Sequence, residues 1–195
     1  QLMPRKTHQV EPRLIAEYCQ ERYSKFPVVL GQPLGRVKKE LVSELGIKRA
    51  TNLVRPFRPE VDAIVVLPNY LLLIEAKIWN VVNGLAKLPL YKSLVPHTDE
   101  FKHFTVWSKV TRPDGTVTQE AEDVDLTQRE VLMQLVVGWS NANLEIMARD
   151  IGVVVEVYSP GWLNEVLERM HNYWTAEYRD AREEKLRLRR LAGLE

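Results

Sequence analysis

Cysteine is almost absent from this sequence, and long apolar runs are missing altogether. One Cys among 195 residues excludes a disulfide framework, a Cys-rich zinc module and a four-cysteine iron–sulfur site. The lack of any run of about 18 apolar residues predicts that no helix spans a membrane. Glycine-rich phosphate loops and a Gly-x-Ser-x-Gly nucleophile motif are missing too. Because the first residues also lack an apolar signal-peptide segment, we expect a soluble, cytoplasmic protein.

The chain does contain enough apolar residues for a core, and its charge is unevenly distributed. A hydrophobic content of 45% excludes wholesale disorder and suffices for one domain of ordinary size. Residues 1–98 carry 15 basic and 8 acidic residues, whereas residues 99–195 carry 12 basic and 18 acidic residues. The basic half is typical of a protein with a polyanionic partner. Chance clustering on solvated faces explains the same counts, and charge alone does not decide between the two.

Hydrophobic periodicity predicts a chain of alternating helices and strands. The predicted helices span residues 11–25, 38–45, 83–94, 141–150 and 162–191. The predicted strands span 26–30, 61–67, 70–78, 131–139 and 153–158, and residues 49–59 are predicted to be mostly loop. This order indicates an α/β sandwich with a mixed sheet, in which pairing after residue 78 is parallel.

Three segments and one insertion divide the chain. We expect an N-terminal arm over residues 1–10, a domain over 11–160 and one charged helix over 161–195. The turn Pro113-Asp-Gly115 is typical of a β-hairpin, which we expect as an insertion over about residues 101–120, followed by an acidic loop. The last part of the final helix has little apolar surface. We therefore expect it to contact a partner: a second subunit, an assembly component or nucleic acid.

Charged residues interrupt the two most apolar predicted strands. Asp62 lies in the first of these strands, and Glu75 and Lys77 lie two residues apart in the second. Side chains two apart on a strand share a face, so Glu75 and Lys77 point the same way. Burying an unpaired ion is costly. The pattern therefore indicates either a metal site or a structural ion network, and we favour the metal site.

The turn at Pro68 joins these two strands and predicts that their charged residues meet. Antiparallel pairing about the turn places Asp62, Glu75 and Lys77 at the same end of the hairpin. Two carboxylates make the oxygen-rich site that Mg²⁺ prefers, with Mn²⁺ as a substitute. Such an ion activates water and neutralises a phosphate, and a neighbouring Lys stabilises negative charge. The three residues therefore predict phosphodiester hydrolysis.

The stretch Pro59-Glu-Val-Asp62, followed after twelve residues by Glu75-Ala-Lys77, resembles the signature of the PD-(D/E)XK nuclease superfamily. The resemblance implies a restriction-endonuclease-like αβββαβ core, with a mixed central sheet flanked by helices. It implies a Mg²⁺-dependent deoxyribonuclease with nucleic acid, specifically DNA, as its partner. Asp62, Glu75 and the carbonyl of Ala76 would then be metal ligands, and Lys77 would be the catalytic lysine.

Many members of this superfamily add a Glu from the first helix. The segment Glu11-Pro-Arg-Leu-Ile15 is similar to the helix opening of archaeal Holliday-junction resolvases. On a helical wheel Glu11 falls in the apolar stripe with Ile15 and Tyr18. We therefore prefer Glu11 as the further catalytic residue, ahead of Glu21 and Glu17. The alternative is an acid stabilised by the helix macrodipole.

Four further residues are predicted to contact the substrate. Lys87 and Tyr91 lie four apart on a predicted helix, and helicase-linked exonucleases of the superfamily carry Gln and Tyr at this spacing. Arg55 and Arg58 belong to the basic residues before the motif, which are predicted to follow the phosphate backbone. Packing of Tyr91 and ordinary solvation of the three basic residues are the alternatives.

The tryptophans and the superfamily itself leave other readings open. Trp79 comes two residues after Lys77 and is predicted to pack in the core, with lining of the cleft as the alternative; Trp139 is predicted in the core or an interface. Trp107 either packs at the hairpin or stacks on a base. The alternative function is a non-catalytic nuclease-fold protein that binds nucleic acid or assembles into a larger complex. The intact Asp62, Glu75 and Lys77 set favours the enzyme.

Overall fold

The computed structural model describes residues 10–173, 183–184, 187–188 and 190. The chain divides into two units, one ending at Tyr158 and one beginning at Ser159. The second unit contains helix α6 (Gly161–Tyr173). Residues 1–9 of the predicted arm over residues 1–10, and most of the predicted helix beyond residue 173, lie outside the described residues, whereas Val10 is helical. No helix in the described ranges is both long and apolar enough to cross a membrane.

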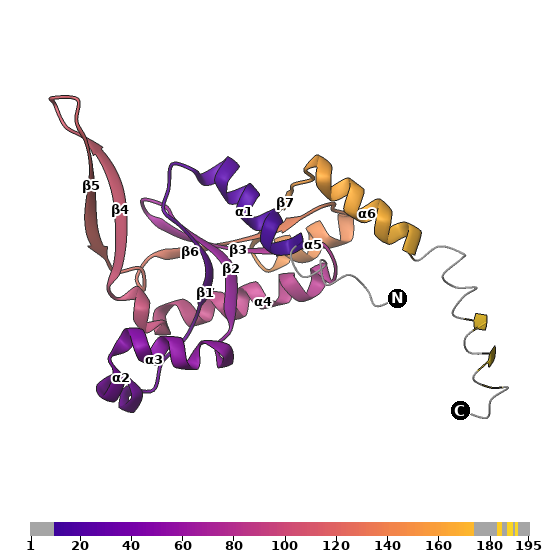
Figure 1. Ribbon diagram of the computed structural model, residues 1–195, viewed down its shortest axis with the longest axis horizontal. Coiled ribbons are helices and arrows are strands. Elements are labelled where there is room, and N and C mark those ends of the chain that lie inside the picture. Colours follow the sequence, from indigo (N-terminus) through magenta and orange to yellow (C-terminus); the bar gives the residue numbers. More distant parts are fainter. Residues whose placement is uncertain (1–9, 174–182, 185–186, 189, 191–195) are drawn as a thin grey trace. The chain divides into compact units, whose positions relative to one another are not determined.

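A mixed five-stranded sheet forms the centre of the first unit (Figure 1). Its strands, in spatial order, are β1 (Val28–Pro33), β2 (Glu60–Val66), β3 (Tyr70–Lys77), β6 (Glu130–Val137) and β7 (Val153–Val157). Pairing is antiparallel from β1 to β3 and parallel from β3 to β7. The predicted mixed α/β architecture, with parallel pairing in its second half, is confirmed. The central strands are buried on both faces, which explains their nearly continuous Val, Ile and Leu runs.

Helices cover both faces of this sheet. Helix α1 (Val10–Tyr23) packs on β1, β2 and β3, whereas α4 (Val81–Leu94) packs on β3 and β6 from the other side (Figure 1). The main apolar core lies under α4, where Leu71, Leu73 and Leu135 meet Leu88. Helix α5 (Ala142–Asp150) begins at Asn141, whose side chain accepts a hydrogen bond from the amide of residue 144.

Several local predictions were wrong. Residues 49–59, predicted as loop, form α3 (Ile47–Val54) and the 3₁₀ turn η2 (Arg55–Phe57). Gly46, with φ of 75°, ends α2 (Lys39–Leu45) and lets α3 begin at the next residue. Strand β1 continues through Gly31 to Pro33, because the flanking residues keep their pairing with β2. Helix α4 begins at Val81, two residues earlier than predicted, and it contains Pro89.

A two-stranded hairpin projects from the body of the first unit (Figure 1). It consists of β4 (Phe104–Thr111) and β5 (Val117–Val124), paired antiparallel. The predicted hairpin is therefore confirmed. Its second strand extends to Val124, so most of the segment predicted as an acidic loop is strand. The short 3₁₀ turns η3 (Val95–His97) and η4 (Asp99–Phe101) connect α4 to this hairpin.

Candidate functional site

The ends of several strands meet at one edge of the sheet and create the site. Strand β2 begins where the antiparallel β3 ends, and β6 ends beside β3. The paired register of β2 and β3 stops at Ala63 and Ile74. Beyond that point the carboxylate of Asp62 is inserted between the strands, and its Oδ2 accepts a hydrogen bond of 2.9 Å from the backbone amide of Ala76.

The ammonium group of Lys77 lies among three carboxylates. Its Nζ is 3.0 Å from Oε2 of Glu11, 3.3 Å from Oε1 of Glu75 and 3.7 Å from Oδ2 of Asp62. Lys87 adds a second ammonium group, 3.3 Å from Oε1 of Glu75. We call these five residues the carboxylate–lysine cluster. When all are ionised, the cluster carries one more negative than positive charge.

Glu75 is the most deeply buried member of the carboxylate–lysine cluster. Its side chain is 1% exposed. Both lysines contact Oε1, whereas Oε2 is buried and has no hydrogen-bond partner among the described residues. A buried carboxylate oxygen without a partner is costly and unusual in a folded protein. Oε2 is therefore an acceptor that no group of the described residues uses.

Glu11 connects the first helix to the end of β3. It lies in the first turn of α1, and its Oε1 accepts a hydrogen bond of 3.1 Å from the amide of Ile78. Its Oε2 accepts a hydrogen bond from Lys77. The two other candidates on α1 bind elsewhere, since Glu17 pairs with Arg13 and Glu21 accepts from Tyr158. Of the three acids, the structure brings Glu11 to the cluster.

Burial and charge shift the protonation equilibria of the carboxylate–lysine cluster. Burial raises the pKa of Asp62, while the amide of Ala76 and the charge of Lys77 oppose the rise. Burial and the neighbouring charge of Asp62 raise the pKa of Glu75. For Lys77, burial lowers the pKa, but Asp62, Glu75 and Glu11 together raise it above the ordinary value. Lys77 is therefore protonated at neutral pH and can donate hydrogen bonds.

Helix α4 approaches the carboxylate–lysine cluster closely because residue 84 is glycine. A Cβ atom built at Gly84 would overlap Cγ of Lys77, and it would lie 3.2 Å from Cδ1 of Leu135 and 3.4 Å from Cγ of Glu75. In the predicted helix 83–94, Gly84 is only the second residue. Glycine is unfavourable inside a helix, so its presence at position 84 was the signal in the sequence for close packing.

Lys87 and Tyr91 follow Gly84 on α4, on the side that faces the cluster. Lys87 contacts Glu75, so the structure brings this predicted substrate residue to the site. Tyr91 is buried, at 5% exposure. Burial and the charges of Glu75 and Asp62 raise the pKa of its phenol, so the hydroxyl stays neutral. Its ring is packed in the interior and does not form an exposed contact surface.

The two predicted arginines have other partners. Arg58 is 6% exposed, pairs with Glu100 and donates to the carbonyls of Leu34 and Gly35. Arg58 therefore connects the segment after β1 to η4, and its phosphate contact stays a prediction. Arg55 is half exposed, but it pairs with Glu60 at 2.9 Å and donates to a β1 carbonyl. The described hydrogen bonds and ion pairs of both arginines lie outside the cluster.

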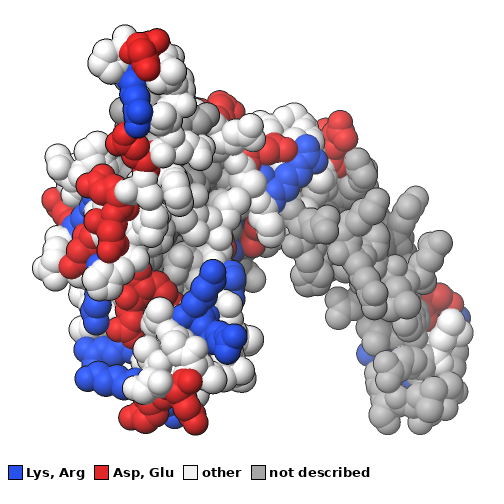
Figure 2. Space-filling view, turned by 60° about the vertical axis from the view of Figure 1, so that its left-hand side comes forward, with Lys and Arg blue, Asp and Glu red and all other residues white. Residues whose placement is uncertain are grey.

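On the face shown in Figure 2, Lys and Arg side chains do not form one uninterrupted surface. In Figure 2, Lys and Arg side chains gather at the lower end of the first unit, where α2 and α3 lie, and acidic side chains lie between them. The same view shows acidic side chains below the hairpin tip. The charge asymmetry of the sequence therefore corresponds to separate patches, and a phosphate-tracking role of the first-half residues stays a prediction.

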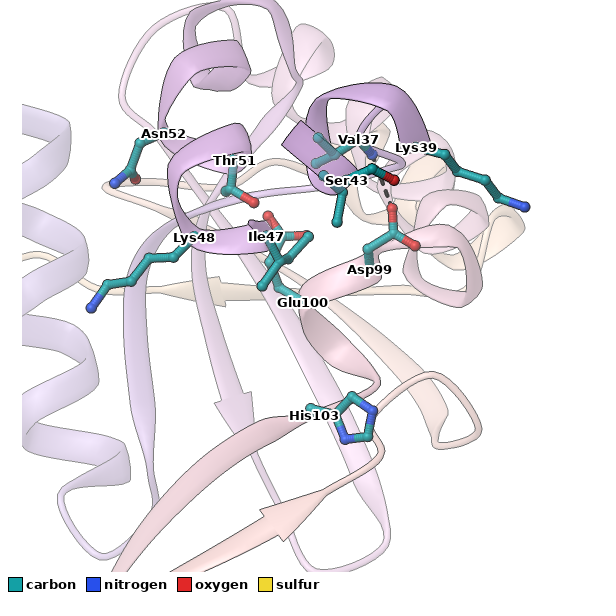
Figure 3. Close-up of a pocket in the computed structure, with 11 residues that line it drawn as sticks. Val37, Lys39, Ser43, Ile47, Lys48, Thr51, Asn52, Asp99, Glu100 and His103 are labelled. Atoms are coloured by element: carbon teal, nitrogen blue, oxygen red, sulfur yellow. Dashed lines mark hydrogen bonds between the residues drawn. The ribbon is translucent and has the colours of Figure 1, made fainter. Parts of the chain in front are cut away.

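A cavity of about 600 Å³ lies apart from the cluster, between α2, α3 and the segment Asp99–His103 (Figure 3). Oγ1 of Thr51 is buried there with no partner in the part of the chain that is described. Asp99 is already used, because it accepts a hydrogen bond of 3.0 Å from the amide of Val37. Lys39 and Lys48 point away from the centre of the cavity (Figure 3), so they do not converge on an anion.

The described residues contain no group of three or more His, Cys, Asp or Glu side chains positioned to hold a metal ion together. Asp62 and Glu75, the two carboxylates predicted as metal ligands, both lie within 3.7 Å of Nζ of Lys77. In comparisons with known proteins, the chain matches no protein-family model, no curated protein and no solved structure. Its function is therefore argued from the geometry of the carboxylate–lysine cluster.

Proposed function

We propose that this chain is a metal-dependent nuclease that hydrolyses DNA phosphodiester bonds on a restriction-endonuclease-like αβββαβ core. One observation carries the proposal: Nζ of Lys77 lies within 3.7 Å of three carboxylates at the edge where β2 begins and β3 ends. A protonated amine beside paired carboxylates suits a reaction that develops negative charge on phosphate oxygens. The mixed sheet with helices on both faces is compatible with this core.

The residues present fit a Mg²⁺ ion. Mg²⁺ typically uses one or two carboxylates and keeps several waters, so Asp62 and Glu75 suffice. The unpartnered Oε2 of Glu75 is the acceptor such an ion would satisfy. The amide of Ala76 already faces Asp62, and the amide and carbonyl of one strand residue point toward the same neighbouring strand. The carbonyl of Ala76 is therefore available as the predicted third ligand. Bound there, Mg²⁺ would supply charge that neutralises a phosphate.

The remaining members of the cluster have separate roles in this proposal. Lys77 donates a hydrogen bond to the attacking water or to a phosphate oxygen and stabilises the charge that develops there. Glu11 acts as a positioning residue, because its two oxygens hold Nζ of Lys77 and the amide of Ile78. Lys87, whose side chain is 39% exposed, offers its ammonium group to a second phosphate oxygen.

A non-catalytic nuclease-fold protein is the second candidate. The observation that favours it is the extent of internal pairing, since each of the three carboxylates has a lysine or an amide as a partner. A self-contained ion network needs no metal. In that case the cluster would only stabilise the fold, and the protein would bind nucleic acid or act as an assembly component.

Cleavage of labelled DNA tests the proposal. Single-stranded, double-stranded and branched substrates would be incubated with Mg²⁺ or Mn²⁺ and with wild type, Asp62→Asn or Lys77→Met. We expect metal-dependent cutting by wild type and loss of cutting in both variants. Glu17→Gln is the matched control, because it removes an acid of α1 that pairs with Arg13 instead. Absence of cutting, together with absence of Mg²⁺ binding, would overturn the enzyme and favour the second candidate.

A further inference from the structure

We infer that an aromatic pocket next to the carboxylate–lysine cluster binds an unpaired nucleobase of the substrate strand. The pocket is a cavity of about 720 Å³. Its lining includes Ile78, Trp79, Asn80, Asn83, Ala86 and Trp139. The inference rests on the proposed function, and it adds the class of substrate.

The pocket begins one residue beyond the cluster. Ile78 belongs to both, since its amide donates to Glu11 at 3.1 Å and it is one of the residues that line the cavity. Trp139 comes two residues after β6, which runs parallel to β3 with Val137 beside Lys77. Parallel pairing therefore brings both tryptophans to the edge of the sheet that carries the cluster. A strand held at Lys77 has its neighbouring nucleotides within reach of the pocket.

The chemistry of the lining suits a base and not a phosphate. No Lys or Arg is found among the described residues that line this cavity. Trp139 is 47% exposed, so a large area of this aromatic residue is accessible to solvent. Every base has a π-face that stacks on an aromatic side chain, whereas a phosphate is usually held by cationic side chains. The side-chain amides of Asn80 and Asn83 offer donors and acceptors to a polar base edge.

The wall of the pocket is held by a short, hydrogen-bonded turn. Asn80 has φ of 53°, and it is the only non-glycine residue with positive φ in the described ranges. Its carbonyl accepts hydrogen bonds from the amides of Asn83 and Gly84, at 2.9 and 3.3 Å. This left-handed residue reverses the chain between β3 and α4 within three residues. The same turn thus carries Trp79, two residues after Lys77, and leads into the helix that contacts Glu75.

The inference has a consequence for substrate choice. A base in a duplex is stacked and paired, so entering a pocket requires that it be unstacked first. Single strands and unpaired ends or branches avoid that cost. We therefore expect the protein to bind and cut DNA with unpaired nucleotides in preference to an uninterrupted duplex.

The test compares binding of two single strands that differ only in their bases. The full chain in EDTA would be titrated with an oligothymidine of about ten nucleotides and with an abasic strand of equal length. Wild type is expected to bind the oligothymidine about tenfold more tightly, because one or two bases stack. Trp139→Ala is expected to bind both strands equally, and Trp139→Phe to retain part of the preference. The salt dependence should not change, since no phosphate contact is lost.

Trp107→Ala is the matched control. It removes another exposed indole, 63% exposed, from the hairpin and outside the pocket. It should keep the full preference for the oligothymidine. Equal binding of the two strands by wild type, or loss of the preference in Trp107→Ala but not in Trp139→Ala, would overturn the inference. Because binding is measured without metal, its result does not depend on cleavage. A preference for the strand with bases, without any cutting, would overturn the proposed nuclease activity and would still support base binding in the pocket.

Discussion

Lys77 and Glu75 project from the same face of β3, and Nζ of Lys77 lies 3.3 Å from Oε1 of a carboxylate that is 1% exposed. The two residues are i and i+2 on one strand, so the alternation of the strand makes them neighbours. Breaking a buried ion pair by removing one partner leaves an uncompensated charge and costs several kcal/mol. Activity and stability at this site are therefore coupled through the same contact.

Lys77→Met should impair both properties. We expect the cleavage rate to fall by at least about a hundredfold, because the variant lacks the proton donor and the charge beside the phosphate. We expect the free energy of unfolding to fall by about 3 kcal/mol, since three carboxylates lose their shared cation. Single-turnover cleavage and urea unfolding measure the two effects. Lys102→Met, which removes a lysine 56% exposed, should change stability by less than about 0.5 kcal/mol. Wild-type cleavage by Lys77→Met would contradict its catalytic role.

Glu11→Gln separates positioning from folding. The amide of Gln still accepts from Ile78, but it no longer holds the ammonium of Lys77 by charge. We expect kcat to fall about tenfold with little change in KM, since a misplaced catalytic group affects the transition state more than binding. Glu17→Gln on the same helix should leave kcat unchanged. An equal decrease in both variants would show that α1 acts only through stability.

The metal-free protein should become less stable as pH rises from about 4 toward neutrality. Asp62 and Glu75 have pKa values raised above 3.8 and 4.5, so the folded state binds more protons than the unfolded state above those values. The free energy of unfolding therefore decreases with pH until the raised folded pKa values are passed. Thermal melts in EDTA from pH 4 to 7 measure the trend. Asp62→Asn should have a shallower slope than wild type, and an identical slope would contradict the raised pKa of Asp62.

Mg²⁺ should reverse this loss at neutral pH. A cation that binds the folded state alone stabilises it by about 2.7 kcal/mol at one hundred times its dissociation constant. We expect melting temperature to rise with Mg²⁺ and return to its starting value after chelation. The double variant Asp62→Asn, Glu75→Gln should lose this response. A rise of equal size in the double variant would place the bound ion elsewhere.

Gly84→Ala tests the close approach of α4. Alanine favours a helix over glycine by about 1 kcal/mol, so an unobstructed site would gain stability. At Gly84 the added Cβ meets the middle of the Lys77 side chain, which cannot move freely between its partners. We expect a loss of about 1–3 kcal/mol and reduced cleavage. Gly161→Ala is the control, because nothing lies within 4 Å of a Cβ there. Increased stability of Gly84→Ala would show that α4 adjusts without strain.

Local sequence patterns predicted the strands of the sheet and the central residues of the site. Continuous apolar runs predicted β2 and β3 to within two residues, and the turn after Leu67 predicted their antiparallel pairing. The proximity of Asp62, Glu75 and Lys77 followed from that pairing, because strand alternation and a short turn operate within about fifteen residues. The predictions failed where neighbouring residues favour different secondary structures. Residues 49–59 looked like loop because of their prolines and basic residues, yet Gly46 allowed a second helix to start.

The sequence by itself determined which strands carry charge and that those charges need partners, since the cost of burying an ion applies in any fold. Only the tertiary structure decided which partners they have. It brought Glu11 to Lys77 from 66 residues away and paired Arg58 with Glu100. It packed α4 so closely on β3 that residue 84 has no room for a Cβ atom. It also placed Trp139 beside the turn that carries Trp79. These contacts depend on helix packing and on the parallel pairing of β3 with β6, which join segments far apart in the chain and leave no local periodicity in it.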